Sequence, residues 1–172
     1  MEIKDKRIDS GKAFDWGKTS AEYAKFRDIY PPEFYQKIVD RGLCVKGQRV
    51  LDLGTGTGVL PRNMYKFGAD WTGTDISPEQ IEQAKRLAKA GGMKIDFRAV
   101  PTEALTSQPD FKKGSFDVIT ACQCFWYFDH EKVMPLLAAG MKFMSLYLMP
   151  IMMFFICNNL SSALSYYYLL SN

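Results

Sequence analysis

The sequence predicts an α/β fold in which helices cover both faces of a parallel sheet. Two observations predict it: a buried strand runs directly into a glycine-rich turn near residue 54, and strand-like and helix-like segments alternate from there onward. At 172 residues the chain is long enough for one domain with a single sizeable core. In such a sheet a ligand is expected beyond the carboxyl ends of the strands, at the switch point beside the first strand.

The stretch Val50-Leu51-Asp52-Leu53-Gly54-Thr55-Gly56-Thr57-Gly58 fixes the start of this pattern. Apolar residues around one carboxylate predict a buried strand, and glycines at every second position let the backbone turn sharply and approach a ligand. The loop therefore predicts nucleotide binding. A phosphate-binding Walker loop would end in Gly-Lys-Ser/Thr, which is absent, and a dinucleotide fingerprint would place Gly or Ala where Val59 stands.

The first half of the chain supplies three predicted helices and one strand. A short helix over 20–27, with Ser20 as a cap, ends before Pro31-Pro32, because a residue that precedes proline avoids the helical region. Pro32 suits the first turn of a second helix. The predicted ranges are 20–27 and 32–40 for these helices, 49–53 for the first strand and 58–67 for the helix after the glycine loop.

The second half continues the alternation. Ser77-Pro78-Glu79-Gln80 predicts a helix start, with Ser77 as the cap and Gln80 placed to reach back as in a capping box. Gly91-Gly92 ends that helix. The remaining predicted elements are strands over 69–75, 93–99, 116–121 and 142–148 and a helix over 129–141.

Composition narrows the class of protein. The formal net charge of +3 comes without a basic run, so nucleic acid is not indicated as a partner. The first residues carry no apolar segment of a secretory signal, so a cytoplasmic location is the default expectation. Four cysteines without a Cys-x-x-Cys pair, together with one histidine, predict neither a zinc site nor a disulfide framework, and buried thiols are the simpler interpretation.

Asp75 ends the second predicted strand, at the edge of the sheet where the glycine loop lies. A carboxylate there can accept hydrogen bonds from both hydroxyls of an unphosphorylated ribose. The alternative is an Asp that only introduces the helix capped by Ser77. Ribose binding is favoured, but it fits an NAD enzyme as well as any other nucleoside-binding protein.

Three stretches in addition to the glycine loop resemble one family. They are Tyr23-Ala24-Lys25-Phe26-Arg27-Asp28-Ile29-Tyr30-Pro31, Ala99-Val100-Pro101-Thr102-Glu103-Ala104-Leu105, and the segment 114–129 with its aromatic run. With Asp-x-Gly-x-Gly-x-Gly and Asp75, the sequence from about 20 to 148 resembles class I S-adenosylmethionine-dependent methyltransferases of the ubiquinone and menaquinone biosynthesis type. The resemblance implies a Rossmann-like sheet in the order 3-2-1-4-5, S-adenosyl-L-methionine as cofactor and a small-molecule methyl acceptor.

The resemblance also implies a set of binding residues. Arg27 would meet the methionyl carboxylate of the cofactor, for which a guanidinium fork is well shaped. The loop at Thr102 would lie along the edge of the adenine, although family members often have Asp where Pro101 stands. Glu103 could equally be a solvated loop acid. The implied cofactor-binding residues are Tyr23, Arg27, Asp52, Gly54, Thr55, Gly56, Asp75, Ile76, Thr102, Glu103 and Gln123.

Methyl transfer from a sulfonium needs few side chains, because positioning the acceptor supplies much of the rate. A general base is required only where the acceptor must lose a proton. The aromatic run near Trp126 can line an apolar pocket and attract a sulfonium cation, or it can belong to the core. His130 is the only imidazole, and a lone His at a helix start is more often structural, so no catalytic residue is predicted.

The end of the chain departs from the family pattern. No charged residue follows Lys142, and the apolar stretch 143–157 contains Pro150 and is shorter than the roughly 20 residues of a membrane-spanning helix. A tail anchor is therefore a minority expectation. The hypothesis is a shortened chain lacking the last two strands, with a cofactor-binding domain over 1–148 (residues 1–18 loose) and an uncharged apolar tail over 149–172.

Two other functions remain open from the sequence. One is a non-catalytic binding module that keeps the nucleoside pocket but does not methylate. The other is an NAD-dependent oxidoreductase, which Val59 and the Tyr-Arg segment before the first strand disfavour.

Overall fold

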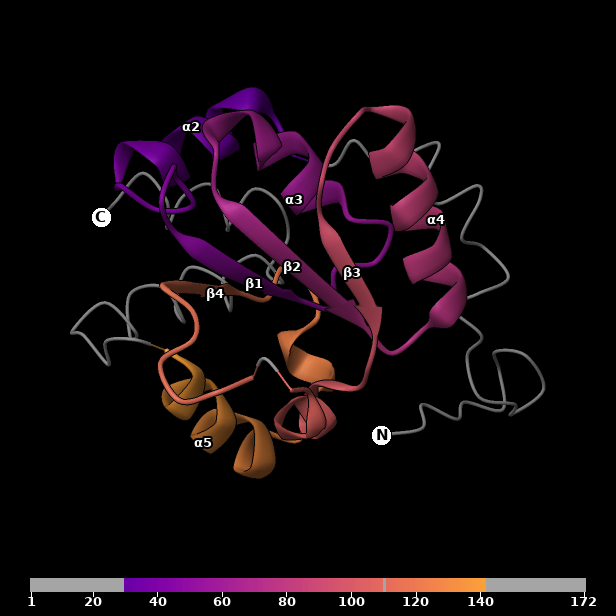
Figure 1. Ribbon diagram of the computed structural model, residues 1–172. Coiled ribbons are helices and arrows are strands. Elements are labelled where there is room, and N and C mark those ends of the chain that lie inside the picture. Colours follow the sequence, from indigo (N-terminus) through magenta and orange to yellow (C-terminus); the bar gives the residue numbers. More distant parts are fainter. Residues whose placement is uncertain (1–29, 110, 142–172) are drawn as a thin grey trace, which may run out of the picture.

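A computed structural model describes residues 30–109 and 111–141. Within them four parallel strands form one sheet in the order β3-β2-β1-β4 (Figure 1). The strands are β1 Arg49–Leu53, β2 Asp70–Asp75, β3 Asp96–Ala99 and β4 Val118–Thr120. The α/β fold and the predicted order of the first four strands are confirmed.

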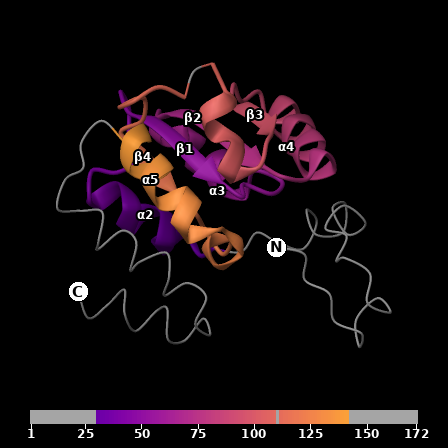
Figure 2. The ribbon, with the colours of Figure 1, turned by 90° about the horizontal axis from the view of Figure 1, so that it is seen from below.

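Helices cover both faces of this sheet. The α-helices are α2 Pro32–Asp40, α3 Val59–Met64, α4 Pro78–Ala90 and α5 His130–Gly140, and the short 3₁₀ helices are η2 Tyr65–Phe67, η3 Thr102–Ser107 and η4 Phe125–Tyr127. Figure 1 shows α2, α3 and α4 on one side of the sheet and α5 on the other. Seen from below in Figure 2, α5 lies across the sheet in front of β4. The helices predicted over 32–40 and 58–67 are confirmed, the latter as α3 followed by η2.

The core lies on both sides of β1, whose side chains alternate between the two helix layers. Val50 packs with buried residues of α2 and α3, and Leu51 and Leu53 pack with buried residues of α5. Residues Val50 to Leu53 are all buried, as expected of a central strand in a parallel sheet. The alternation leaves Asp52 on the side of α2 and α3, directly before the glycine loop.

The edge strands are shorter than predicted. Met93 and Lys94 do not belong to β3, because their amides donate to the Ala88 carbonyl at 2.9 Å and to the Tyr65 hydroxyl at 3.1 Å. β4 likewise covers only the middle of the predicted 116–121. Phe116 instead forms a single parallel bridge with Met141, the residue before the predicted fifth strand.

Several predictions concern residues outside the described ranges. They are the helix over 20–27, which contains Tyr23 and Arg27, and the strand over 142–148. The apolar stretch 143–157 and the tail 149–172 also lie outside the described residues. Among residues 30–109 and 111–141, no helix is long and apolar enough to cross a membrane.

Candidate functional site

The glycine loop joins β1 to α3 and uses a left-handed backbone at each glycine. Gly54, Gly56 and Gly58 have φ values of 57°, 57° and 75°, which residues with a Cβ rarely adopt. A Cβ on Gly54 would lie 2.7 Å from the Cys124 Sγ, and one on Gly58 would lie 2.5 Å from the Phe97 ring. Two of the glycines are therefore required by packing inside the protein.

Gly56 differs from its neighbours because the space beside it is open. The nearest atom to a Cβ added at this position would be the Gln80 Oε1 at 4.0 Å. The backbone at Gly56 is thus the part of the loop that a ligand can approach closely.

Asp75 joins the end of β2 to this loop. Its Oδ2 accepts a hydrogen bond from the Gly56 amide at 2.8 Å, and its Oδ1 accepts one from the Ser77 amide at 2.9 Å. Burial raises the pKa of the Asp75 carboxyl above its usual value, and the hydrogen bonds from the Ser77 and Gly56 amides oppose that rise. The carboxylate keeps lone pairs for further donors, because two oxygens offer about four acceptor positions.

Of the capping arrangement predicted before α4, the cap at Ser77 is confirmed and the reciprocal contact of the Gln80 side chain is wrong. The Gln80 amide donates to the Ser77 hydroxyl at 3.3 Å, so Ser77 is the cap. In a capping box the Gln80 side chain would accept from the Ser77 amide, but here the Asp75 carboxylate accepts from it. The Ser77 hydroxyl donates to Glu79 at 2.8 Å. Asp75 therefore introduces the helix, as one of the two interpretations expected, and it also binds the glycine loop.

Asp52 is a buried carboxyl directly beneath the loop, with 2% of its surface exposed. Burial raises its pKa to about 6, the Thr120 hydrogen bond and the facing Thr55 side chain lower it, and the nearby Asp75 charge adds to the rise. Thr120 donates to the Asp52 Oδ1 at 2.6 Å. Thr120 was not among the residues predicted from the sequence, because its position opposite Asp52 is set by the register between β1 and β4.

Tyr30 is the first described residue after the Tyr23–Arg27 segment. Its ring stacks on Phe34 with centroids 4.3 Å apart. Burial raises the pKa of its hydroxyl well above the usual value, and the neighbouring Cys122 and Asp52 add to the rise. The first described residue therefore feels the charge of the carboxyl beneath the glycine loop.

The other predicted site residues inside the described ranges also follow strand ends at this edge. Ile76 comes after β2 with 69% of its surface exposed, and Thr102 is buried at the start of η3. Gln123 follows β4 with a left-handed φ of 61°. Because the four strands are parallel, their carboxyl ends bring these residues to the edge that holds Gly56 and Asp75.

Glu103 has a structural contact that the sequence did not predict. Its Oε1 accepts a hydrogen bond from the Asp129 amide at 3.2 Å, which ties η3 to the start of α5. Asp129 is the cap of α5, and its side chain accepts from the Lys132 amide. Glu103 is thus an exposed side chain that braces two elements around the site.

His130 also has a structural place. Its Nε2 lies 2.9 Å from the Phe125 carbonyl oxygen, and its ring stacks on the Phe125 ring at 4.7 Å. The turn held in this way exposes Trp126 and Tyr127 by 49% and 45%. Within the described residues Cys44, Cys122 and Cys124 are free thiols, and no group of three metal-binding side chains comes together.

Comparison with known proteins decides the family. The methyltransferase domain family matches residues 50–143, which include the glycine loop, Asp75, η3 and α5. The chain belongs to this family. The methyltransferase match separates the chain from NAD-dependent oxidoreductases, which the sequence had already disfavoured.

Proteins similar to the chain include one curated relative and two solved structures. The ubiquinone biosynthesis O-methyltransferase of Bordetella avium is 31% identical over 116 residues, covering 66% of this chain and 46% of the relative. The crystal structure of the YcgJ protein of Bacillus subtilis has a TM-score of 0.56 and 27% identity, covering 64% of this chain and 46% of that one. A SAM-dependent methyltransferase of Aquifex aeolicus shares the fold with a TM-score of 0.55 at 19% identity, covering 75% and 68%. The chain spans about half the length of the curated relative.

Proposed function

We propose that this methyltransferase domain binds S-adenosyl-L-methionine against the glycine loop and transfers its methyl group to a small organic acceptor. The observation that carries the proposal is the Asp75 carboxylate, held at 2.8 Å from the Gly56 amide at the open part of the loop. The family match and a relative named as an O-methyltransferase support it.

The residues at the sheet edge fit the parts of this cofactor. The free lone pairs of Asp75 suit the two ribose hydroxyls, and the open backbone at Gly56 lets the nucleoside approach without a Cβ in the way. The exposed Ile76 offers an apolar surface for the flat face of adenine. We assign the adenine edge to the backbone near Thr102, with Glu103 beside it.

The remaining assignments concern the methionyl end. Asp52, Gly54 and Thr55 lie where β1 enters the loop, and Gln123 lies after the adjacent strand β4. We assign these four residues to the amino-acid part of the cofactor. The predicted contact of Arg27 with its carboxylate, with Tyr23 on the same segment, remains part of the proposal because both precede the described residues.

The cofactor supplies a methyl group on a sulfonium that is already a good leaving group. The protein's part is to bind and orient the nucleoside and to hold an acceptor in line with the methyl, which is where effective molarity raises the rate. No described side chain needs to act as a base in this scheme. The Nε2 of His130 already contacts the Phe125 carbonyl, which is consistent with a structural role.

Calorimetric titration tests cofactor binding. The chain is expected to bind S-adenosylhomocysteine and not NAD, and Asp75→Asn is expected to weaken binding by roughly 10- to 100-fold, because a charged acceptor is lost from two hydroxyl contacts. Asp40→Asn, an exposed carboxylate on α2, is the matched control and should bind normally. Binding of NAD in preference to S-adenosylhomocysteine would refute the proposal.

Methyl transfer is tested separately, because the chain spans 46% of the curated relative. Transfer of a labelled methyl group to one member of a panel of small phenols, amines and thiols is expected. Tight binding with no transfer to any acceptor would contradict turnover and favour the binding module.

A further inference from the structure

Gly73 lies inside β2, where a glycine weakens a strand and often marks a place that another group approaches closely. It does not have a left-handed φ, so its backbone conformation does not require glycine. A Cβ at this position would lie 2.8 Å from two atoms of the Phe97 ring and 2.9 Å from the Thr55 hydroxyl oxygen. Gly73 is therefore needed for space, and the side chains of Phe97 and Thr55 converge on that space.

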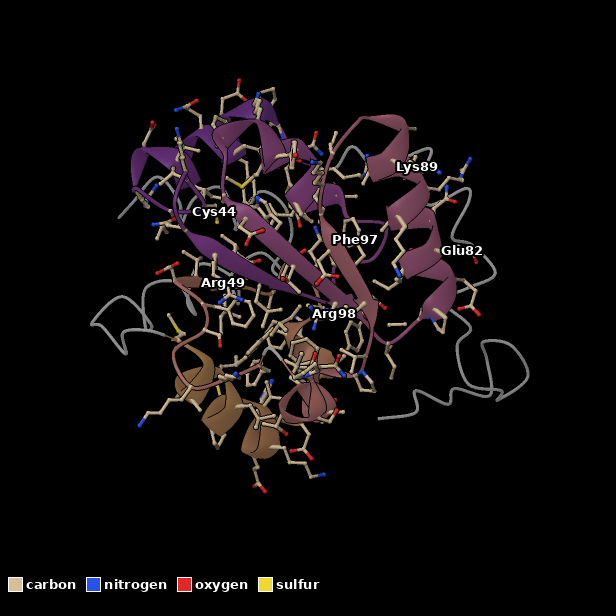
Figure 3. The ribbon with its side chains drawn as sticks, in the orientation of Figure 1. Cys44, Arg49, Glu82, Lys89, Phe97 and Arg98 are labelled. Atoms are coloured by element: carbon tan, nitrogen blue, oxygen red, sulfur yellow. The ribbon has the colours of Figure 1, made fainter. Side chains whose placement is uncertain are left out.

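The Phe97 ring comes from β3, at the edge of the described sheet. Phe97 is paired with Gly73, and Gly73 is paired with Asp52, so the three positions share one face of the sheet. Figure 3 shows Phe97 beside β3, toward α4. Its side chain is 2% exposed. The buried residues that pack with it all belong to α4, and they are Ile81, Ala84 and Ala88.

The same ring reaches the end of the glycine loop. A Cβ on Gly58, the first residue before α3, would lie 2.5 Å from the Cζ of Phe97. The Gly58 amide donates to the Thr55 carbonyl at 2.9 Å and so closes the turn Thr55–Gly58. The ring thus packs against one end of this turn and lies beside the side chain at its other end.

Gly56 is the second residue of the turn and has little packing of its own. The nearest atom to a Cβ added there would be the Gln80 Oε1 at 4.0 Å, and the Gly56 amide donates to Asp75 at 2.8 Å. The place of Gly56 relative to Asp75 therefore depends on how the two ends of the turn are held. Such small displacements matter, because a shift of about 1 Å can cost roughly 100-fold in an enzyme's rate.

From this arrangement we propose that Phe97 is a positioning residue of the cofactor site. It is buried and acts through Gly58 and Thr55, so that the edge strand β3 sets the geometry of the Gly56 amide and Asp75. The effect on affinity rests on the proposed cofactor site, whereas the effect on the Gly56 amide needs no ligand.

Calorimetric titration with S-adenosylhomocysteine, below the melting temperature of every variant, tests the effect on affinity. Phe97→Leu lacks the outer ring atoms and should weaken binding by roughly 10-fold. Phe97→Met restores most of the lost volume with a flexible side chain and should bind within about threefold of wild type. Leu137→Ala is the control, because it truncates a buried residue of α5 on the other face of the sheet. It should lower the melting temperature at least as much as Phe97→Leu and still bind normally.

The NMR signal of the Gly56 amide, recorded without ligand, gives a second measurement. Phe97→Leu should shift this signal, because the turn moves relative to Asp75, and Leu137→Ala should leave it in place. Gly73→Ala tests the contact from the side of β2. Its added Cβ should displace the ring and weaken S-adenosylhomocysteine binding in wild type, and it should weaken binding less in Phe97→Leu, which has fewer atoms to displace.

Three results would overturn the role of Phe97. They are binding by Phe97→Leu as tight as wild type, an equal loss of affinity in Phe97→Leu and Leu137→Ala, and an equal effect of Gly73→Ala with and without the ring. If wild type binds no S-adenosylhomocysteine, the proposed cofactor fails and the Gly56 signal decides the role of Phe97. A signal that does not move in Phe97→Leu would then overturn it.

Discussion

The Asp75 carboxylate and the Gly56 amide are joined by a hydrogen bond of 2.8 Å, which fastens the end of β2 to the glycine loop. The other oxygen of the same carboxylate caps the start of α4 through the Ser77 amide. One side chain therefore sets the shape of the loop and the position of the next helix. Loss of this side chain should consequently affect both stability and ligand binding.

Asp75→Ala is expected to lower the free energy of unfolding by about 1–3 kcal/mol, because two partly buried amides lose their acceptor. Asp75→Asn should lower it less, since its amide oxygen can still accept from one of them. Urea denaturation measures both values. Asp40→Ala, on the exposed surface of α2, is the control and should change stability by less than about 0.5 kcal/mol. Equal stability of Asp75→Ala and wild type would contradict the bridging role.

The glycine loop allows a matched comparison of two residues with the same φ of 57°. Gly54→Ala and Gly56→Ala should each lose about 1–2 kcal/mol from the left-handed backbone alone. Gly54→Ala should lose more, because its Cβ would meet Cys124 at 2.7 Å, whereas the Cβ of Gly56→Ala meets open space. Gly56→Ala should instead weaken S-adenosylhomocysteine binding more than it weakens the fold.

Thermal or urea melts and calorimetry on the same two variants separate these effects. The double variant Gly54→Ala/Cys124→Gly should recover part of the stability lost by Gly54→Ala, because it removes the clashing atoms. If Gly54→Ala and Gly56→Ala were equally stable, the packing role of Cys124 would be wrong.

Asp52 predicts a specific dependence of stability on pH. Its folded-state pKa of about 6 lies above the usual 3.8, so the folded protein takes up this proton more readily than the unfolded chain. The contribution of Asp52 is therefore most favourable below about pH 4 and is lost as the pH rises through about 6. Asp52→Asn should be more stable than wild type at pH 7, by up to about 3 kcal/mol.

The difference between the Asp52→Asn and wild-type unfolding free energies should shrink toward zero as the pH is lowered from 7 to 4. Urea denaturation at a series of pH values measures it. A difference that stays constant over this range would show that Asp52 does not titrate in it.

The prediction for His130 separates a structural from a catalytic role. His130→Ala removes the contact with the Phe125 carbonyl and the ring stack, and it should lower the unfolding free energy by about 1–2 kcal/mol. Methyl transfer measured at a temperature where the variant is folded should fall by less than about tenfold, with an unchanged pH profile. Loss of one limb of that profile would instead indicate that His130 exchanges a proton in the reaction.

The residues around the glycine loop explain why so much of the fold followed from the sequence. Gly54, Gly56 and Gly58 indicate a strand-to-helix turn because each adopts a left-handed backbone. Ser77-Pro78 indicates the start of α4 because Ser77 caps it. Both signals are local and do not depend on distant residues. The strand order followed from the family that these motifs resemble.

Features that depend on contacts between distant segments were not predictable in the same way. β3 begins late because Tyr65, far away in the sequence, binds the Lys94 amide, and Thr120 reaches Asp52 only once β4 lies beside β1. The capping role of Asp75 was weighed as an alternative to ribose binding, yet its two oxygens allow both. Glu103 was expected in the loop after the third strand, but its bond to the Asp129 amide required the fold.

The central claim is that Asp75 holds the ribose of an S-adenosyl nucleoside, and a double-mutant cycle tests it most directly. Wild type and Asp75→Ala are each titrated calorimetrically with S-adenosylhomocysteine and with its 2′-deoxy analogue. Wild type should bind the deoxy analogue roughly 10-fold or more weakly, and Asp75→Ala should bind both compounds with nearly equal, low affinity. An equal loss on deoxygenation in both proteins, or no binding of either compound by wild type, would contradict this role of Asp75.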